Sequence, residues 1–149
     1  LLSQPYVDAK NISLDGWSYG GFMVLSLIST YPEYFNSATC GGPVVDWSGY
    51  EIMYGERYMD TPQENPEGYH STSILPKVKN INANLLIFHG GKDDVVLWQH
   101  SLKLLNQAVE DGILINYFVY PNHEHNVRGL DRVHLWKMIE QHHKTYLKQ

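Results

Sequence analysis

Residues 12–28 read ISLDGWSYGGFMVLSLI, and the expected fold follows from this stretch. A short β-prone run at 12–14 leads into Gly-Trp-Ser-Tyr-Gly, and an apolar helical pattern then runs from Gly20 to Tyr31. A serine with glycines two positions away on either side, between a strand and a helix, is typical of a nucleophile elbow. Small residues suit so sharp a turn, and the helix points its first amide groups at developing negative charge. The alternative is a glycine-rich turn without chemistry.

The rest of the chain continues the alternation of strands and helices. Further strands are expected at 38–45, 85–88 and 113–120, and helices at 98–109 and 130–147. Between the second and third strands, residues 46–76 are rich in aromatic residues, Gly and Pro, and short helices are expected there. Strand–helix alternation predicts right-handed crossovers, so we expect an α/β fold with a mostly parallel sheet and helices on both faces.

The position of the first strand indicates a larger fold. It begins almost at residue 1, and residues 1–7 resemble the tail of an earlier helix. A buried parallel strand needs neighbours on both sides. The 149 residues allow one domain, and we expect them to be the C-terminal part of something longer.

Composition excludes several classes of protein. Hydrophobic residues make up 43% and charged residues 18%, so the chain can bury a core and is not a disordered tail. A net charge of −5 with no basic cluster argues against a nucleic-acid partner. Cys40 is the only cysteine, which excludes a disulfide framework and a cysteine-built zinc site. No apolar run approaches the roughly 20 residues of a membrane helix, and no signal peptide is recognisable.

Two more polar stretches follow predicted strands. His-Gly-Gly-Lys-Asp-Asp occupies 89–94, and Pro-Asn-His-Glu-His-Asn occupies 121–126. By itself, the first has the composition of an ordinary solvated turn. The second also suggests a metal site, but His-x-His in a loop needs a third ligand and no helical His-Glu-x-x-His is present, so no metal is predicted.

Together, the three stretches place a serine, an acid and a histidine, in that order, each in a loop that follows a predicted strand. This is the chain order of α/β-hydrolases. A serine hydroxyl is a weak nucleophile and needs an adjacent imidazole that a carboxylate orients. The sequence therefore predicts a Ser–His–Asp triad with Ser18 as the nucleophile.

The sequence resembles the prolyl oligopeptidase family, and within it the dipeptidyl peptidase IV branch. The motifs that carry the resemblance are Gly-Trp-Ser-Tyr-Gly-Gly at 16–21, Glu-Arg-Tyr-Met at 56–59, His-Gly-x-x-Asp-Asp at 89–94 and the loop of His125. The resemblance runs over almost the whole chain. It implies that residues 1–149 are the C-terminal portion of an α/β-hydrolase catalytic domain, with upstream strands and a β-propeller outside this chain.

The resemblance also implies the roles of individual residues. Ser18 is the nucleophile, Asp93 the acid and His125 the general base, while Asp94 is a neighbour of the acid. The backbone N–H of Tyr19 is one oxyanion donor. The family's second donor, a tyrosine hydroxyl from an earlier strand, and the paired glutamates that hold the substrate's amino terminus are absent from this chain. Weak or absent activity is therefore expected of the chain alone.

Positions similar to the family's S1 pocket, which takes proline or alanine, are Val44, Trp47, Tyr50, Tyr54 and Val96. The three aromatic residues are spaced by three and four, which predicts a shared helical face. Core packing would produce the same spacing, so the pocket depends on the resemblance. Two departures from the family are Val95, where relatives often carry an asparagine that binds the substrate carbonyl, and Asn126, where they carry glycine.

The expected function is that of a serine exopeptidase releasing N-terminal dipeptides with Pro or Ala second, through an acyl-enzyme and without a cofactor. Its substrates would be peptides with a free N-terminus. Alternatives are an acylaminoacyl peptidase, a prolyl endopeptidase or an aminopeptidase of the same family, and a non-catalytic interaction domain. The branch also suggests a homodimer, with the helix at 130–147 as a candidate surface, and bacterial relatives are often periplasmic or surface-exposed.

Overall fold

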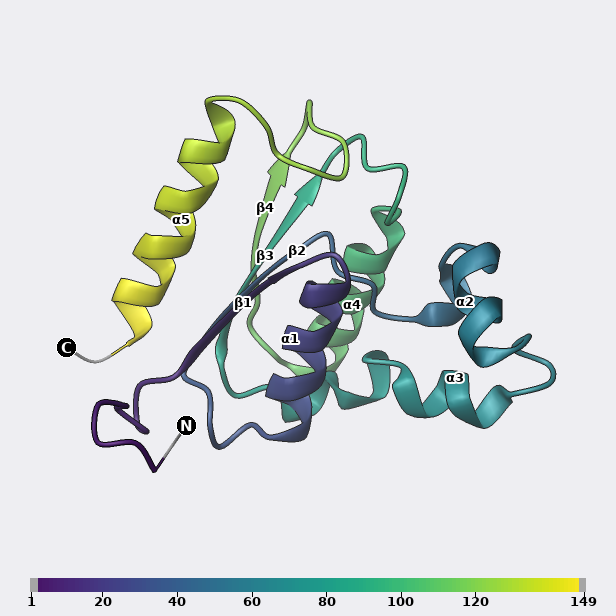
Figure 1. The fold of residues 1–149 in the computed structure, drawn as a ribbon, viewed down its shortest axis with the longest axis horizontal. Helices are drawn as coiled ribbons and strands as arrows, with labels where there is room; N and C mark the ends of the chain where they lie inside the picture. The colour runs from purple at the N-terminus through teal and green to yellow at the C-terminus, as the bar shows by residue number, and fades with distance from the viewer. Residues whose placement is uncertain (1–2, 148–149) are drawn as a thin grey trace.

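In the computed structural model, which describes residues 3–147, four parallel strands form one sheet with helices on both of its faces (Figure 1). In the order of the sheet, the strands are β1 (Ser13–Trp17), β2 (Ser37–Gly41), β3 (Asn84–Gly90) and β4 (Asn116–Tyr120). Every neighbouring pair is parallel. The predicted α/β class and parallel sheet are confirmed.

Two layers of helices cover this sheet. The α-helices are α1 (Tyr19–Thr30), α2 (Ile52–Met59), α3 (Pro66–Thr72), α4 (Gln99–Asp111) and α5 (Asp131–Tyr146), and η1 (Trp47–Gly49) and η2 (Leu75–Asn80) are short 3-10 helices. Helix α5 lies on one face of the sheet, and α1 and α4 lie on the other (Figure 1). No helix within residues 3–147 is long and apolar enough to cross a membrane.

Strand β3 shows why the sequence is apolar at every position from residue 85 to residue 88. Leu85 and Ile87 belong to the core beneath α1 and α4, whereas Leu86 and Phe88 belong to the core beneath α5. None of the four is more than 5% exposed. Because successive side chains of a strand point to opposite faces, a strand covered on both sides needs an apolar residue at every position.

Several boundaries differ from the sequence expectations, and β1 for example extends to Trp17 although the β-prone run was expected to end at residue 14. Strand β2 ends at Gly41 rather than at residue 45, because Gly42 has a φ of +46° and Pro43 cannot donate to a neighbouring strand. Strand β4 begins at Asn116 rather than 113, since the N–H of Ile113 donates to the carbonyl of Ala108 and holds the chain against the end of α4.

The N-terminal segment also differs from the expectation. Residues 3–7 form turns and not the expected tail of a helix, with the N–H of Val7 donating to the carbonyl of Gln4. Pro5 lies inside this segment and has no N–H to contribute to a helix. Residues 1 and 2 lie outside the described range.

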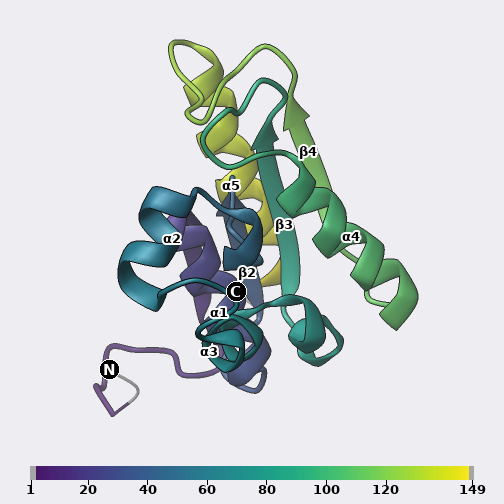
Figure 2. The ribbon, with the colours of Figure 1, turned by 90° about the vertical axis from the view of Figure 1, so that its right-hand side faces the viewer.

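The segment at 46–76 does form short helices, as predicted. Figure 2 shows α2 and α3 beside α1, away from the sheet. The N–H of Ile74 donates to the carbonyl of Val45 at 2.9 Å, and the Asn65 side chain caps α3 by accepting from the N–H of Gly68 at 3.0 Å. These bonds fix a layer of aromatic side chains directly after β2.

Candidate active site

Ser18 lies at the turn between β1 and α1 with a backbone conformation that few residues adopt. Its φ is 59° and its ψ is −118°, and Asp60 is the only other non-glycine residue with positive φ in the described range. Its N–H donates to the carbonyl of Gly41 at 2.7 Å, and its own carbonyl accepts from the N–H of Phe22 at 3.1 Å. Such a conformation costs on the order of 1–3 kcal/mol and persists only where neighbouring contacts impose it.

The two glycines of the motif have different surroundings. A Cβ atom at Gly16 would lie 2.3 Å from the carbonyl oxygen of Gly20 and 2.9 Å from a methyl carbon of Val24. A Cβ atom at Gly20 would meet nothing within 4 Å in the described part of the chain. The steric reason for small flanking residues therefore applies to Gly16 and not, within that part, to Gly20.

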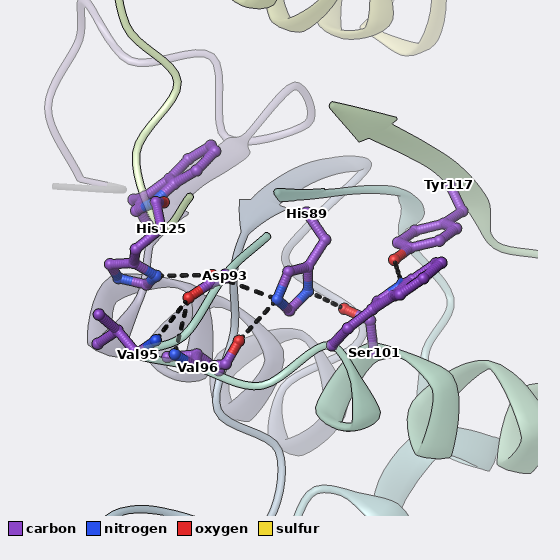
Figure 3. A network of polar contacts seen from close by, with 9 residues as sticks. His89, Asp93, Val95, Val96, Ser101, Tyr117 and His125 are labelled. Carbon is purple, nitrogen blue, oxygen red and sulfur yellow. Dashed lines mark hydrogen bonds and ion pairs between the residues drawn. The ribbon is translucent and has the colours of Figure 1, made fainter. Parts of the chain in front are cut away.

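Asp93 and His125 form a direct hydrogen bond between the loops that follow β3 and β4 (Figure 3). His125 Nδ1 lies 2.8 Å from Asp93 Oδ2. Asp93 Oδ1 accepts the backbone N–H groups of Val95 at 3.0 Å and Val96 at 2.9 Å, and its side chain is fully buried. Asp94, its neighbour, is exposed.

The surroundings of Asp93 keep it ionised. Burial raises the pKa of this carboxyl group, but the hydrogen bonds from His125, His89 and the N–H of Val96 outweigh burial and hold the pKa well below its usual range. An ionised carboxylate can only accept, so Nδ1 of His125 carries the proton and Nε2 is the basic nitrogen. The pair thus has the arrangement of a general base and the acid that orients it.

Contacts at the ends of β1 and β2 bring the turn of Ser18 close to His125. Trp17 Nε1 donates to the carbonyl oxygen of His125 at 2.8 Å. A Cβ atom at Gly42 would lie 3.1 Å from His125 Cε1 and 3.2 Å from Asp93 Oδ2. No hydrogen bond joins the Ser18 hydroxyl to the His125 ring in the described structure, and such contacts are often loose in enzymes without substrate. All three residues lie at the carboxyl ends of the strands, the edge where sheets of this type hold functional groups.

Two strand-terminal glycines permit this close approach, and sequence reasoning did not identify them. A Cβ atom at Gly41 would overlap the Trp17 ring at 1.9 Å, and one at Gly90 would lie 2.0 Å from the carbonyl oxygen of Glu124. The available signal was that both β2 and β3 end in glycine at the edge of the triad. A backbone or ring can pack this closely only where no side chain intervenes.

The aromatic residues predicted for the S1 pocket contact one another but do not share a helical face. The Trp47 and Tyr54 rings are stacked with centroids 5.8 Å apart, and the Trp47 and Tyr50 rings meet edge to face at 5.4 Å. Trp47 lies in η1, Tyr54 lies in α2, and Tyr50 lies between them with extended backbone. The prediction of one face was wrong because the chain leaves the helical conformation at Tyr50.

A cavity of about 420 Å³ lies beside the stacked rings. Its lining consists of Tyr19, Phe22, Trp47, Tyr54, Gly55, Tyr58, Met59 and Thr72. Of the five predicted pocket residues, only Trp47 and Tyr54 line this cavity. Tyr50 lines a neighbouring groove with Val95.

Val44 and Val96 were predicted to line the S1 pocket, but they are buried in the core. They are 1% and 0% exposed and pack in the same core cluster as Trp47. Sequence reasoning missed Phe22, whose ring meets that of Trp47 at 5.1 Å, and it missed the side chain of Tyr19, whose ring meets the same indole at 5.9 Å. The sequence signal that could have found them is their spacing of three residues at the start of α1, which places both side chains on one face of the helix.

The two histidines of the His-Glu-His stretch face different partners. His123 Nε2 is hydrogen-bonded to Asp131 Oδ2 at 2.7 Å, whereas His125 bonds Asp93. Within residues 3–147, no group of three or more His, Cys, Asp or Glu side chains could hold a metal ion.

The parallel sheet and the elements around Ser18 are those of the C-terminal part of an α/β-hydrolase. The chain belongs to the prolyl oligopeptidase family of serine peptidases, whose family model matches residues 1–149.

Individual proteins that are similar to this chain are described as dipeptidyl peptidases. The chain is 39% identical over 148 residues to a "Probable dipeptidyl-aminopeptidase B" of Arthroderma gypseum, covering 97% of this chain and 16% of that protein. It superposes on a Bacteroides ovatus structure described as a candidate dipeptidyl aminopeptidase IV with a TM-score of 0.96 and 46% identity, covering 97% of this chain and 20% of that one. For Porphyromonas gingivalis dipeptidyl peptidase 4, the TM-score is 0.94 and the identity 33%, over 98% of this chain and 21% of that one.

Proposed function

We propose that the protein containing this chain is a serine exopeptidase that releases N-terminal dipeptides with Pro or Ala at the second position. The observation that carries the proposal is the 2.8 Å bond between His125 Nδ1 and Asp93 Oδ2, at the sheet edge where Ser18 occupies a strained turn. Membership in a peptidase family and the similarity to dipeptidyl peptidases support it.

In the proposed reaction, Ser18 Oγ attacks the carbonyl carbon of the second residue, and its proton passes to His125 Nε2. Asp93 stays ionised and stabilises the imidazolium that forms. The N–H of Tyr19, the first residue of α1, donates to the oxyanion of the tetrahedral intermediate. The C–N bond then breaks, His125 gives its proton to the leaving amine, and water hydrolyses the acyl-enzyme by the same proton path.

The aromatic cluster supports the proposed preference for proline or alanine. A pyrrolidine ring has no group that donates or accepts a hydrogen bond, so flat apolar faces such as those of Trp47 and Tyr54 suit it. Tyr50 contributes an edge to this cluster. In the proposed pocket, Val44 and Val96 act from the core, as support beneath the rings.

Recognition of the substrate's amino terminus is proposed to come from elsewhere in the protein. The chain spans 16% of the length of the Arthroderma relative, which supports a complete site that includes residues beyond it. The β-propeller with paired glutamates and the second oxyanion donor remain predictions from the family resemblance.

Labelling with a fluorophosphonate tests the nucleophile. In the full-length protein, we expect one covalent adduct at Ser18, no adduct in Ser18→Ala, and unchanged labelling in Ser71→Ala, which alters an exposed serine of α3. Mass spectrometry of the digested protein locates the adduct. A full-length protein that is folded but unlabelled at Ser18 would contradict the catalytic proposal.

Three chromogenic substrates test the subtype. Release of p-nitroaniline from free Gly-Pro should greatly exceed release from blocked Gly-Pro and from acetyl-Ala, because a dipeptidyl peptidase requires a free amine. Equal rates for blocked and free Gly-Pro would exclude the dipeptidyl assignment, and preference for acetyl-Ala would indicate an acylaminoacyl peptidase instead.

A further inference from the structure

We propose that His89 is a positioning residue of the triad, which holds the carboxylate of Asp93 in the orientation that His125 requires. The inference rests on the proposed function, since it assigns a role in the same site. Figure 3 shows Asp93 between the two imidazoles, with a contact to each.

His89 is bonded at both ring nitrogens although no solvent reaches it. It lies in β3 and is 0% exposed. Its Nε2 lies 2.8 Å from the carbonyl oxygen of Val96 and 3.3 Å from Asp93 Oδ2, and its Nδ1 lies 2.7 Å from Ser101 Oγ. A buried polar ring with this set of partners is held in one orientation.

The partners determine where the proton lies. A carbonyl oxygen can only accept, so Nε2 of His89 carries the hydrogen that bonds Val96. Nε2 also lies 3.3 Å from Asp93 Oδ2, so the carboxylate is a longer second contact of the same N–H. Nδ1 then accepts the hydroxyl hydrogen of Ser101, and every contact is satisfied by a neutral ring.

The hydrogen on Nε2 of His89 contacts two residues of the loop that carries the acid. One N–H of His89 bridges the side chain of Asp93 and the carbonyl of Val96, while the N–H of Val96 donates to Asp93 Oδ1. Asp93 therefore has donors on both oxygens, and His89 and His125 share Oδ2. Without His89, Oδ2 keeps only the contact to His125, so this oxygen is held less firmly in the position that His125 requires.

The outer side of His89 is anchored by α4 and β4. Ser101 lies in α4 and is fully buried. It also interacts with the hydroxyl of Tyr117 in β4, which accepts a hydrogen bond from Trp98 Nε1 (Figure 3). Because these groups come from α4, from the residue before it and from β4, the position of the His89 ring is set by the packing of α4 against the sheet and not by the loop alone.

The test compares variants of the full-length protein. His89→Leu removes the bridging N–H, and His89→Gln keeps an amide donor near the position of Nε2. The matched control is His142→Leu, because His142 is also buried and bonded through Nε2 to a carbonyl, that of Asn84 at 2.8 Å, but lies in α5 without contact to Asp93.

We expect His89→Leu to lower kcat on the order of 10- to 100-fold with KM changed less than about threefold, because a misdirected base weakens the transition state and not substrate binding. The acid limb of the pH profile should move to lower pH, because a carboxylate that is no longer held toward Nδ1 stabilises the His125 imidazolium less. His89→Gln should restore most of kcat, and His142→Leu should leave the pH profile unchanged.

A folded His89→Leu protein with wild-type kcat and an unmoved acid limb would overturn the proposal. If His89→Leu does not fold, Ser101→Ala decides: lower kcat with the same direction of pH shift supports the proposal, and unchanged kinetics overturns it. Failure of the proposed function looks different, since the wild-type protein would then be unlabelled at Ser18 and its hydrolysis would survive Ser18→Ala.

Discussion

At the scale of single residues, Asp93 is the group on which most contacts of the candidate site converge. Two backbone N–H groups bond one oxygen, and His125 and His89 approach the other. A carboxylate that accepts from so many donors is ionised at neutral pH and cannot turn without breaking several bonds. Its geometry thereby sets the direction in which His125 presents its basic nitrogen.

Replacing Asp93 with Asn should lower kcat by about 10⁴-fold, because an amide favours the tautomer of His125 that has its basic nitrogen on the wrong side. The matched control is Asp94→Asn, which alters the exposed neighbouring carboxylate and should change kcat by less than about twofold. Steady-state hydrolysis of Gly-Pro-p-nitroanilide by the full-length protein measures both. Comparable losses in the two variants would contradict the assignment of Asp93 as the acid.

The stability of the wild-type protein relative to the Asp93→Asn variant should depend on pH in a defined direction. Since the pKa of Asp93 is lowered in the folded protein, its ionised form stabilises the fold above the unfolded pKa of about 3.9. That contribution disappears as the pH falls through the folded-state pKa. The difference in unfolding free energy between wild type and variant should therefore be constant above about pH 5 and shrink on acidification below about pH 4. Urea unfolding at several pH values measures it, and a difference that grows in acid would refute it.

At the scale of elements, the site depends on how closely strand ends and loops approach. Gly41 ends β2 beneath the Trp17 ring, and Gly90 ends β3 beneath the backbone of the His125 loop. Both contacts exclude any side chain at the glycine. The carboxyl edge of the sheet is therefore the place where three loops can come within hydrogen-bonding distance.

The two glycines of the Ser18 motif should respond differently to alanine. Gly16→Ala should destabilise the protein by about 1–3 kcal/mol or prevent folding, because its methyl group would meet the carbonyl of Gly20. Gly20 lies in α1 and has open space around it among the described residues. Gly20→Ala should therefore change the free energy of unfolding by less than about 1 kcal/mol. Thermal unfolding of the two variants measures the contrast. Equal destabilisation would show that an additional part of the protein packs against Gly20.

The aromatic side chains of η1 and α2 should determine the preference for proline. Trp47→Ala and Tyr54→Ala should lower kcat/KM for Gly-Pro substrates by roughly 10- to 100-fold, with smaller losses for substrates carrying a flexible second residue, because stacked rings are lost. Met53→Ala, an exposed change in the same helix, serves as the control. Equal losses for all substrates would indicate a folding defect and contradict the pocket assignment.

At the scale of the whole molecule, the sheet of the described residues ends at β1 and β4. Strand β1 carries the turn of Ser18 and pairs only with β2 within this part. The relatives are several times longer than the chain. In the proposed function, Ser18, Asp93 and His125 come from this chain, whereas the amine anchor and the second oxyanion donor come from residues outside it.

The isolated chain should hydrolyse Gly-Pro-p-nitroanilide at less than about 1% of the rate of the full-length protein, because loss of one oxyanion donor costs about 10²–10³ in rate. Both proteins are compared at equal concentration of folded material, judged by circular dichroism. Equal rates would show that the chain contains a complete site and would contradict the predicted role of the upstream residues.

Local sequence determined the kind of each element and the order of the functional residues. Apolar periodicity and glycine positions are properties of neighbouring residues, so they predicted a parallel α/β sheet and the motif of Ser18. The choice of Asp93 over Asp94 came from family resemblance, since both acids follow the same strand. Tertiary structure alone decided which side chains meet: the contact of His89 with Asp93, the bond from Trp17 to His125 and the burial of Val44. These contacts depend on how strands align and loops pack, and local periodicity does not encode the distance between loops that are far apart along the chain.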